Sequence, residues 1–319
     1  MSNSAITSLR LGTRGSLLAR AQSRLVADSL RQLHPGLRID EVVYKTTGDA
    51  IADRPLHDLG GKGLFTKELE QALLNREIDF AVHSFKDLPV TLPLVEQANL
   101  IIAAVPVRED ARDLLVSGGA KRLADLPPGA RVGTGSLRRR CQILACRGDL
   151  IVEPVRGNID TRLRKFRDGH FDAIVLAMAG VRRAGLFDPA IMTPLDESEM
   201  LAAPGQGALA LQCRRDDSST ADLLAAMNDP ATAAAVAAER ELVRLLGGDC
   251  LSPIAAQAHA SGQIFRLKAV VGGRGGQLPV LRAAAEGPDP VSAAKSVYNS
   301  LSQHGVTRLL HGVDVQETT

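Results

Sequence analysis

The stretch VGTGSLRRRCQ, residues 132–142, runs from a short apolar segment through a turn of small residues into a basic helix. A strand that leads through such a turn into a helix is the repeating unit of an α/β fold. The turn also gathers free backbone N–H groups, hydroxyls and guanidinium groups. We therefore expect Thr134, Ser136, Arg138 and Arg139 to line an anion-binding site; the alternative is a solvated basic helix face.

Strand-like and helix-like segments alternate on both sides of this stretch. Such alternation indicates α/β layers with largely parallel sheets. The expected elements are strands at about 8–13 and 37–46 around a helix over 15–33, a helix over 64–76, a strand at 78–84, a strand at 150–155, a helix over 159–169 and a strand at 171–177.

The pattern changes in the last third of the chain. MLAAPGQGALALQC, residues 200–213, indicates a return segment followed by a strand. Asp229 is placed to cap a long alanine-rich helix, with Pro230 in its first position. Three strand-like runs and a last helix around 291–301 complete a smaller α+β unit.

The composition limits the possible functions. The chain has 319 residues, 45% of them hydrophobic, which is enough for two or three domains with their own cores. Its 38 Lys and Arg residues nearly balance 36 Asp and Glu residues, so non-specific binding to nucleic acid is not expected. Neither a signal peptide nor an apolar stretch of membrane-spanning length is present, so we expect a cytoplasmic protein that does not contact a membrane.

The cysteines do not suggest a metal site. The four cysteines, at 141, 146, 213 and 250, form no CxxC pair and have no histidine-rich neighbour, so we expect neither metal nor disulfide. Cys250 lies on a glycine loop, in LLGGDCLSPI, residues 245–254. Two glycines free the backbone and Pro253 stiffens the exit, which would present the thiol outward. A buried cysteine that acts as a small hydrophobic residue is the alternative.

The glycine-rich segments do not match nucleotide-binding motifs. GGKG, residues 60–63, lacks the earlier glycine and the following Ser or Thr of a Walker motif. GTGSLR, residues 133–138, fails the dinucleotide fingerprint at its sixth position, and GQGALA, residues 205–210, is followed by a strand instead of a helix. A flexible loop and a hinge turn are the alternatives to a binding role.

Further arginines follow other strand-like segments. Arg14, Arg156, Arg162 and Arg183 all lie near predicted strand ends or the turns after them. In open α/β sheets the ligand crevice lies at the carboxyl ends of the strands, so these side chains could converge on one cleft. A nearly neutral chain with such a cleft indicates a protein that binds a small molecule rich in carboxylates or phosphates.

One acidic residue lies near this predicted cleft. FAVHSFKDLP, residues 80–89, places Ser84, Lys86 and Asp87 just past the end of a buried strand. Arginine neighbours would keep the Asp87 carboxylate ionised and able to face a cationic intermediate. A surface Lys–Asp ion pair is the alternative. We interpret His83 as a packed strand residue, because no second His or Cys lies at metal-binding spacing.

Together these motifs resemble the porphobilinogen deaminase family, also called hydroxymethylbilane synthase. The resemblance covers about residues 9–260 and rests on segments in the family's order and approximate spacing: LGTRGSLLARAQ, GGKGLFTKELE, FAVHSFKDLP, GTGSLRRR, VRGNIDTRL, AGVRRAGL, PGQGALALQCR and GGDCLSPIAA. It implies an α/β fold of two lobes like those of periplasmic binding proteins, joined by a double crossover, plus a smaller α+β C-terminal domain. We place domain 1 at residues 1–107 and 206–228, domain 2 at 108–205 and domain 3 at 229–319.

The resemblance also implies an activity. In this family a dipyrromethane cofactor, built from two porphobilinogen molecules, is attached through a thioether to the cysteine that Cys250 matches. The enzyme adds four porphobilinogen units to this primer, releasing ammonia each time, and hydrolyses off hydroxymethylbilane. Asp87 matches the catalytic carboxylate, which would stabilise the positive charge left when ammonia departs.

The same resemblance assigns the remaining site residues. The cofactor would be held by Ser84, Lys86, Thr134, Ser136, Arg138, Arg139 and Arg162. The incoming pyrrole and the growing chain would be handled by Arg14, Ser16, Arg156 and Arg183, with Lys62 on a loop over the cleft. The sequence departs from some family members at Asp58, where they carry a lysine.

Two other functions stay open at this point. A two-lobed small-anion-binding protein would share the fold and the arginines, but it would not need Cys250 or Asp87. A phosphoribosyltransferase-like enzyme would need a pyrophosphate loop and magnesium ligands, which the sequence does not show. For the favoured function we expect porphobilinogen as the small-molecule partner and a monomeric enzyme.

Overall fold

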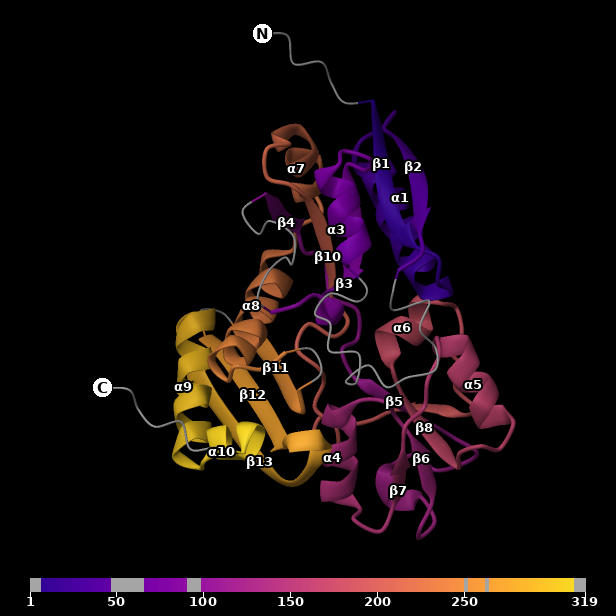
Figure 1. Cartoon of the computed structure of the whole chain (residues 1–319), viewed down its shortest axis with the longest axis vertical. Helices are drawn as coiled ribbons and strands as arrows, with labels where there is room; N and C mark the ends of the chain where they lie inside the picture. The colour runs from indigo at the N-terminus through magenta and orange to yellow at the C-terminus, as the bar shows by residue number, and fades with distance from the viewer. Residues whose placement is uncertain (1–6, 47–65, 91–98, 250–251, 262–263, 313–319) are drawn as a thin grey trace.

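The chain forms three β-sheets with helices packed on them (Figure 1). The structure, a computed structural model, describes residues 7–46, 66–90, 99–249, 252–261 and 264–312. Figure 1 shows the first sheet at the top, the second at the lower right and the third at the lower left. Among the described residues, no helix is long and apolar enough to span a membrane.

The first sheet has five strands in the order β2-β1-β3-β10-β4. Helix α1 packs on it through Val26, Ala27 and Leu30, which join Leu9 and Leu11 in a buried apolar cluster. The strands are β1 (Ser8–Arg14), β2 (Arg38–Tyr44), β3 (Phe80–Ser84), β4 (Leu100–Ala104) and β10 (Leu209–Arg214), and the helices are α1 (Leu17–Leu33), α3 (Lys67–Leu74) and α7 (Ser218–Ala225).

The second sheet repeats this arrangement in the order β7-β6-β8-β5-β9. Its helices include α4, which begins at Leu137 within the stretch VGTGSLRRRCQ. The strands are β5 (Asp113–Ser117), β6 (Arg131–Gly133), β7 (Ile151–Glu153), β8 (Ala173–Ala177) and β9 (Met192–Pro194), and the helices are α4 (Leu137–Cys146), α5 (Ile159–Arg167) and α6 (Met178–Arg183).

The expectation of largely parallel sheets is wrong for half of the strand pairings. In the first sheet β1 pairs in parallel with β2 and β3, but β10 is antiparallel to β3 and β4. The second sheet has the same mixture around β5. In each sheet the antiparallel strand arrives from the other sheet at the carboxyl edge: Leu209 starts beside Ser84, and Asp113 starts beside Ala177. A strand that enters at that edge has to run back across the sheet.

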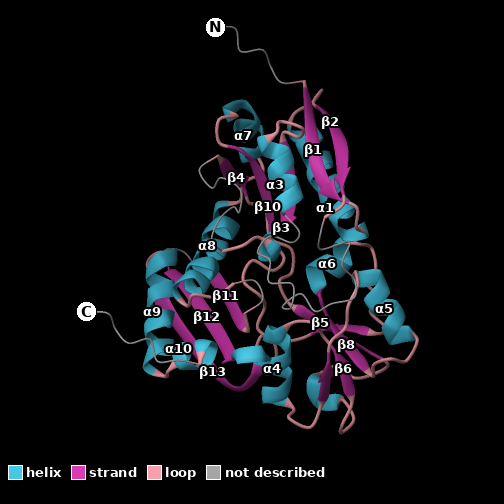
Figure 2. Cartoon of the chain, in the orientation of Figure 1, coloured by secondary structure: helices cyan, strands magenta, loops and turns pink. Residues whose placement is uncertain are grey.

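The third sheet is an antiparallel meander, as the α+β pattern predicted (Figure 2). Asp229 caps α8 by accepting a hydrogen bond from the Thr232 N–H at 2.7 Å, and Pro230 is in the first turn, so this prediction is confirmed. The elements are α8 (Pro230–Leu245), β11 (Ile254–Ser261), β12 (Ile264–Gly273), β13 (Gln277–Gly287), α9 (Pro290–Gln303) and α10 (Val306–His311).

The two α/β lobes, their two crossings and the smaller α+β unit therefore agree with the predicted fold class. The sequence pattern predicted the elements around the motifs, but not β4, β5 or β9, or the short helices α6, α7 and α10. Each sheet falls within the segments predicted for one domain. The domain bounds themselves stay a prediction.

The third sheet packs directly against α4. A short 3-10 turn, Arg274–Gly276, lies against the start of this helix, and α4 also contacts β12 and β13. Gly276 has a φ of 72°, and a Cβ atom there would lie 2.7 Å from the Leu137 carbonyl oxygen. Only glycine allows this close approach. The helix that carries the arginines is thus held from behind by the third unit.

A buried carboxylate of α8 joins the three units. Glu239 is fully buried and accepts hydrogen bonds from Arg108 Nη1 at 2.7 Å, from the Gly205 N–H at 2.6 Å and from the Ala258 N–H at 2.9 Å. Arg108 and Gly205 lie on the two segments that cross between the first and second sheets, while Ala258 is in β11. One side chain therefore ties both crossings to the third sheet.

We predict that Glu239→Gln lowers the free energy of unfolding by about 3–5 kcal/mol, because it leaves the Arg108 guanidinium buried without its counter-charge. Urea unfolding followed by circular dichroism measures this loss. Glu241→Gln on the same helix is the control, since it removes a more exposed pair with Arg244 and should cost under about 1 kcal/mol. Equal losses in the two variants would contradict this role of Glu239.

Candidate active site

The turn after β3 holds the predicted catalytic residue, Asp87, and the predicted cofactor-binding residue Lys86. A 3-10 helix, Phe85–Asp87, follows the buried strand and leaves the Lys86 and Asp87 side chains partly exposed. Arg240 of α8 holds this turn: it donates to the Leu88 and Pro89 carbonyls at 3.0 and 2.5 Å, and its guanidinium lies 4.9 Å from the Phe85 ring centroid.

The start of α4 is a compact hydrogen-bonded turn. The Ser136 hydroxyl caps the helix by accepting from the Arg139 N–H at 3.4 Å, and Thr134 Oγ1 accepts from the Ser136 N–H at 3.2 Å. Both oxygens accept these bonds, so each hydroxyl hydrogen stays available to donate to an anion. The alternative of a solvated basic face is wrong for Arg138 and Arg139, which are only 4% and 5% exposed.

A buried carboxylate pairs with both arginines. Asp113, fully buried at the start of β5, accepts from Arg138 Nη1 at 2.7 Å and from Arg139 Nη2 at 2.8 Å. Burial alone would raise the pKa of Asp113, but the two arginines outweigh it and hold the pKa well below its usual range. Asp113 is therefore an anion at neutral pH.

A single glutamine links this pair to the first lobe. Gln206 donates from Nε2 to Asp113 Oδ1 at 2.8 Å and to the Ala111 carbonyl at 2.7 Å. Its Oε1 accepts from Lys86 Nζ at 3.2 Å. Burial lowers the pKa of Lys86 to about 8, with Arg139 adding to the effect and Asp87 opposing it. Lys86 thus lies within electrostatic reach of the second lobe's arginines.

The other predicted arginines of the second lobe lie near the same place. Arg162 donates from Nε to the Gly157 carbonyl at 2.8 Å. Burial, Arg139 and Arg156 lower the pKa of Arg162 to about 10, while Asp87 opposes the shift from the first lobe.

Arg183, at the end of α6, reaches the return crossing. It donates from Nη2 to the Gly207 carbonyl at 2.9 Å, and burial lowers its pKa. The two lobes also touch nearby, where α1 contacts α6. Arg183 therefore lies where the second lobe meets the segment that leads back to the first.

Asp87 also lines a small hollow of about 50 Å³ in the first lobe, together with Arg14, Ser16 and Ser84. Ser16 caps α1 by accepting from the Ala19 N–H at 3.3 Å. Within the described residues, Asp87 accepts no hydrogen bond, so its carboxylate stays open. The first lobe thus contributes an open carboxylate with an arginine in the same hollow.

His83 is a packed strand residue, as predicted. It is 5% exposed, and its Nε2 lies 3.0 Å from Gln212 Oε1. Burial lowers the pKa of His83 to about 4, and Arg14 contributes to the shift. The imidazole is therefore neutral at physiological pH. Among the described residues, no group of His, Cys, Asp and Glu side chains could hold a metal ion.

Three residues of the sequence analysis, Cys250, Lys62 and Asp58, lie outside the described residues. The other cysteines are described. Cys141 and Cys213 are buried, and burial raises the pKa of each thiol to about 11. Cys146, the last residue of α4, is exposed as a residue, but its sulfur lies 3.6 Å from the Glu199 carbonyl, and partial desolvation raises the pKa of this thiol as well. None of these three is an activated thiol, because reactive thiols have a lowered pKa.

Sequence reasoning missed three side chains that hold predicted site residues or the turn that carries them. Asp113 begins an apolar strand, Gln206 lies in a segment predicted as a hinge turn, and Arg240 lies on the alanine-rich helix. The one available signal was an aspartate at the start of a strand, where acidic residues are depleted. Nothing in the local pattern showed which arginines Asp113 would meet.

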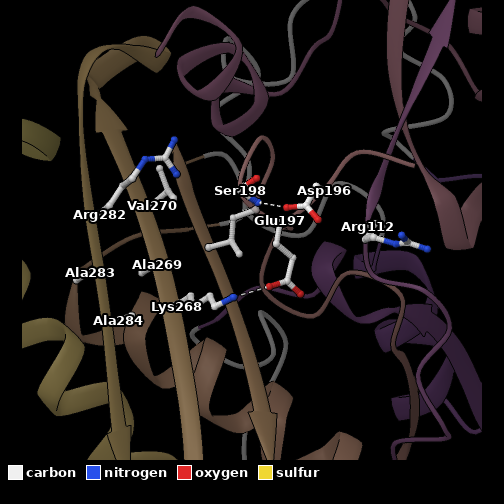
Figure 3. A pocket seen from close by; sticks show the side chains of 11 residues that line it. Arg112, Asp196, Glu197, Ser198, Lys268, Ala269, Val270, Arg282, Ala283 and Ala284 are labelled. Atoms are coloured by element: carbon white, nitrogen blue, oxygen red, sulfur yellow. Dashed lines mark hydrogen bonds and ion pairs between the residues drawn. The ribbon is translucent and has the colours of Figure 1, made fainter. Parts of the chain in front are cut away.

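A larger hollow of about 680 Å³ lies between β12, β13 and the segment before Leu201 (Figure 3). Its acidic groups already have partners: Glu197 accepts from Lys268 Nζ at 2.8 Å, and Asp196 accepts from the Ser198 N–H at 2.8 Å. Of the predicted site residues that the structure describes, none lines it. Arg14, Ser16, Ser84 and Asp87 line the small hollow of the first lobe instead.

Comparisons with protein families cover most of the chain. Residues 9–222 match the model described as porphobilinogen deaminase, dipyromethane cofactor binding domain, and residues 233–303 match porphobilinogen deaminase, C-terminal domain. The porphobilinogen deaminase of Syntrophobacter fumaroxidans is 46% identical over 308 residues, covering 96% of this chain and 97% of that protein. The porphobilinogen deaminase of Acidithiobacillus ferrooxidans is 45% identical over 306 residues, covering 96% and 98%.

Solved structures show more distant likenesses. The methionine binding protein MetQ is 12% identical with a TM-score of 0.43, covering 69% of this chain and 89% of that chain. The aliphatic sulphonate binding protein SsuA from Escherichia coli is 17% identical with a TM-score of 0.40, covering 75% and 70%. At these TM-scores the likenesses add nothing to the fold that the sheets define.

We predict that Lys86 in the ligand-free protein loses its proton near pH 8 instead of near its usual 10.5. Acetylation at increasing pH, with peptide mass mapping, should show its reactivity rising around pH 8, and the exposed Lys121 reports reagent activity. Because the folded chain releases this proton before the unfolded chain, Lys86 alone makes the free energy of unfolding rise between pH 8 and 10.5. Labelling of Lys86 that begins only near pH 10 would contradict the prediction.

Proposed function

The chain belongs to the porphobilinogen deaminase family, and on this premise we propose how its residues divide the work of a hydroxymethylbilane synthase in tetrapyrrole biosynthesis. This transferase condenses four porphobilinogen molecules with release of ammonia and yields hydroxymethylbilane. The observation that carries the proposal is the hydrogen-bonded link between the lobes: Gln206 accepts from Lys86 Nζ at 3.2 Å and donates to Asp113 at 2.8 Å. Asp113 in turn accepts from Arg138 and Arg139 of the second lobe.

The cluster of Lys86, Arg139 and Arg162 suits the dipyrromethane cofactor, which appears in the description of the matching family domain. Each pyrrole of the cofactor carries acetate and propionate groups. Lys86, Arg139 and Arg162 all have pKa values lowered by burial and by neighbouring cations, so a ligand with several carboxylates would relieve their repulsion. When bound, the cofactor supplies the pyrrole carbon to which the substrate units are added.

The proposed holding residues offer two kinds of donor. Charged N–H groups from Lys86, Arg138, Arg139 and Arg162 would bind the carboxylates of the cofactor. Hydroxyls would donate the remaining bonds, because Thr134 Oγ1 and Ser136 Oγ already accept backbone N–H groups and keep their hydrogens free. Ser84, which is hydrogen-bonded to Gln22 at 3.0 Å, would complete this set.

Asp87 is the proposed catalytic residue. Its open carboxylate would hold the pyrrole N–H and stabilise the positive charge that develops when ammonia leaves the aminomethyl group. The cleft around it is rich in cations, which disfavour that charge, so a carboxylate is needed where the charge develops. Asp87 would also accept and return the proton that moves as the new bond forms.

The substrate residues are proposed from their positions around Asp87. Arg14 and Ser16 share the small hollow with Asp87, and they would bind the carboxylates of the incoming pyrrole. Arg156 and Arg183 lie in the second lobe, where they would hold the growing chain. Lys62 would add a further cation over the cleft.

Cys250 is the proposed attachment site of the cofactor. The three described cysteines support this assignment indirectly, since two are buried with a pKa near 11 and the third has a raised pKa at the far end of α4. The family match extends over both parts of the chain and favours this function over an anion-binding protein or a phosphoribosyltransferase. The cytoplasmic location and the monomeric state stay predictions.

We predict that Cys250→Ser yields a chain without the mass of the dipyrromethane adduct. The matched variant Cys146→Ser changes an exposed thiol and should keep the full adduct. Intact-protein mass spectrometry, repeated after acid treatment, measures the occupancy of both. An adduct of parental occupancy on the Cys250→Ser chain would refute the attachment site.

We predict that Asp87→Asn lowers single-turnover ammonia release from porphobilinogen on the order of a hundredfold or more, the effect of losing a preorganised electrostatic group. Asp87→Glu keeps the charge but moves it, so it should retain a small residual rate. Both variants should carry the cofactor. Asp125→Asn, which breaks an exposed ion pair with Arg122, should stay within about threefold of the parent. A similar rate for Asp87→Asn would remove the carboxylate from the mechanism.

A further inference from the structure

Asp113 is a carboxylate that lies among the cationic side chains proposed to bind the carboxylates of the ligand. Its oxygens accept from Arg138 Nη1 and Nη2, from Arg139 Nε and Nη2, and from Gln206 Nε2, at 2.7 to 3.4 Å. A carboxylate has about four lone-pair sites, so these donors occupy it fully. Asp113 therefore has no capacity left to touch a substrate or cofactor, and any effect on the reaction has to act through its partners.

The arginines keep donors free beyond this pairing. Each guanidinium has five N–H donors. Three of those on Arg138 bond Asp113 or the Leu201 carbonyl, and three of those on Arg139 bond Asp113 or the Val175 carbonyl. Within the described part of the chain, this leaves two on each arginine for a ligand. The fixed bonds determine which edge of each guanidinium the ligand meets.

The Gln206 amide has one possible orientation. Its Nε2 lies against Asp113 Oδ1 and the Ala111 carbonyl, which only accept hydrogen bonds, so its Oε1 has to point to Lys86 Nζ. Gln206 is fully buried, and its own carbonyl accepts from Arg108 Nε at 2.7 Å. Hydrogen bonds thus hold both the side-chain amide and the backbone carbonyl of Gln206, which lies on the crossing between the lobes.

We propose that Asp113 and Gln206 are positioning residues that assemble the carboxylate-binding cluster across the two lobes: Asp113 sets the guanidinium groups of Arg138 and Arg139, and Gln206 sets the ammonium of Lys86 relative to them. This inference rests on the proposed function for the identity of the ligand. The inferred position of Lys86 does not depend on the proposed function, because it can be tested without any ligand.

The first test compares two carboxylates that each bridge two arginines. Asp113→Asn removes the counter-charge of Arg138 and Arg139, whereas Asp79→Asn removes that of Arg10 and Arg214 at the other end of β3. Intact mass gives cofactor occupancy, and thermal melting checks the fold. We expect occupancy to fall at least tenfold in Asp113→Asn and to stay near the parent in Asp79→Asn.

Parental occupancy in Asp113→Asn, or an equal loss in both variants at equal melting temperatures, would overturn the role of Asp113. If Asp113→Asn does not fold, Asp113→Glu takes its place, because it keeps the charge but moves it by one methylene group relative to Arg138 and Arg139. Reduced occupancy in a folded Asp113→Glu chain supports the positioning role, since Asp113 does not touch the ligand, and unchanged occupancy overturns it. A parent chain that carries no adduct and releases no ammonia would instead refute the proposed function.

The second test uses two buried glutamines of the return crossing and β10. Gln206→Met removes the acceptor of Lys86 at similar volume, while Gln212→Met alters a glutamine that contacts His83 instead. In the Cys250→Ser background, the pH midpoint of Lys86 acetylation should fall by at least half a unit with Gln206→Met and stay unchanged with Gln212→Met. An unchanged midpoint with Gln206→Met would overturn the role of Gln206, whatever the ligand.

Discussion

The buried pairing of Asp113 with Arg138 and Arg139 is the interaction on which the cluster of cations around Lys86, Arg138 and Arg139 depends. A site for a ligand with several carboxylates needs several cations in one place, and buried cations in one place repel each other. The lowered pKa values of Arg162 and Lys86 reflect burial and this repulsion. One fully buried carboxylate offsets part of it, so the chain's own residues hold the cluster together.

Polar contacts also join the three units, because each sheet has its own apolar core. Separate clusters flank the first sheet and the second, and another fills the third unit between its sheet and α8 and α9. The joints between units combine two small apolar clusters, in which Val236 of α8 packs with Phe85 and Leu201 packs with Ala255, with the polar contacts of Glu239, Gln206 and Arg108. Hydrogen-bonded charges are directional, so they specify one relative arrangement of the units where apolar packing alone would allow several.

The two carboxylates of the cleft differ in what surrounds them. Asp113 accepts from two arginines and a glutamine and is saturated, whereas Asp87 accepts no hydrogen bond from the described residues and lines an open hollow. The same type of side chain, an aspartate, is therefore suited to two different purposes. A saturated carboxylate organises cations, while an open one can stabilise a charge that develops on a substrate.

The sequence by itself determined the local elements and the family. Alternating patterns placed α1, β3 and the start of α8 within a few residues, because hydrophobic period and helix caps are local properties. The motifs also supplied Asp87 and the arginines, since the backbone turns that present them are encoded beside them. Their roles stay predictions.

Only the tertiary structure decided the directions of β5 and β10 and the partners of the buried charges. Asp113 and Gln206 lie 93 positions apart, and Arg108 and Glu239 lie 131 apart. Such pairs form because the chain crosses twice between two sheets and enters each one at its carboxyl edge. A local pattern reports whether a residue is buried, but which charge it meets there depends on how distant segments return to each other.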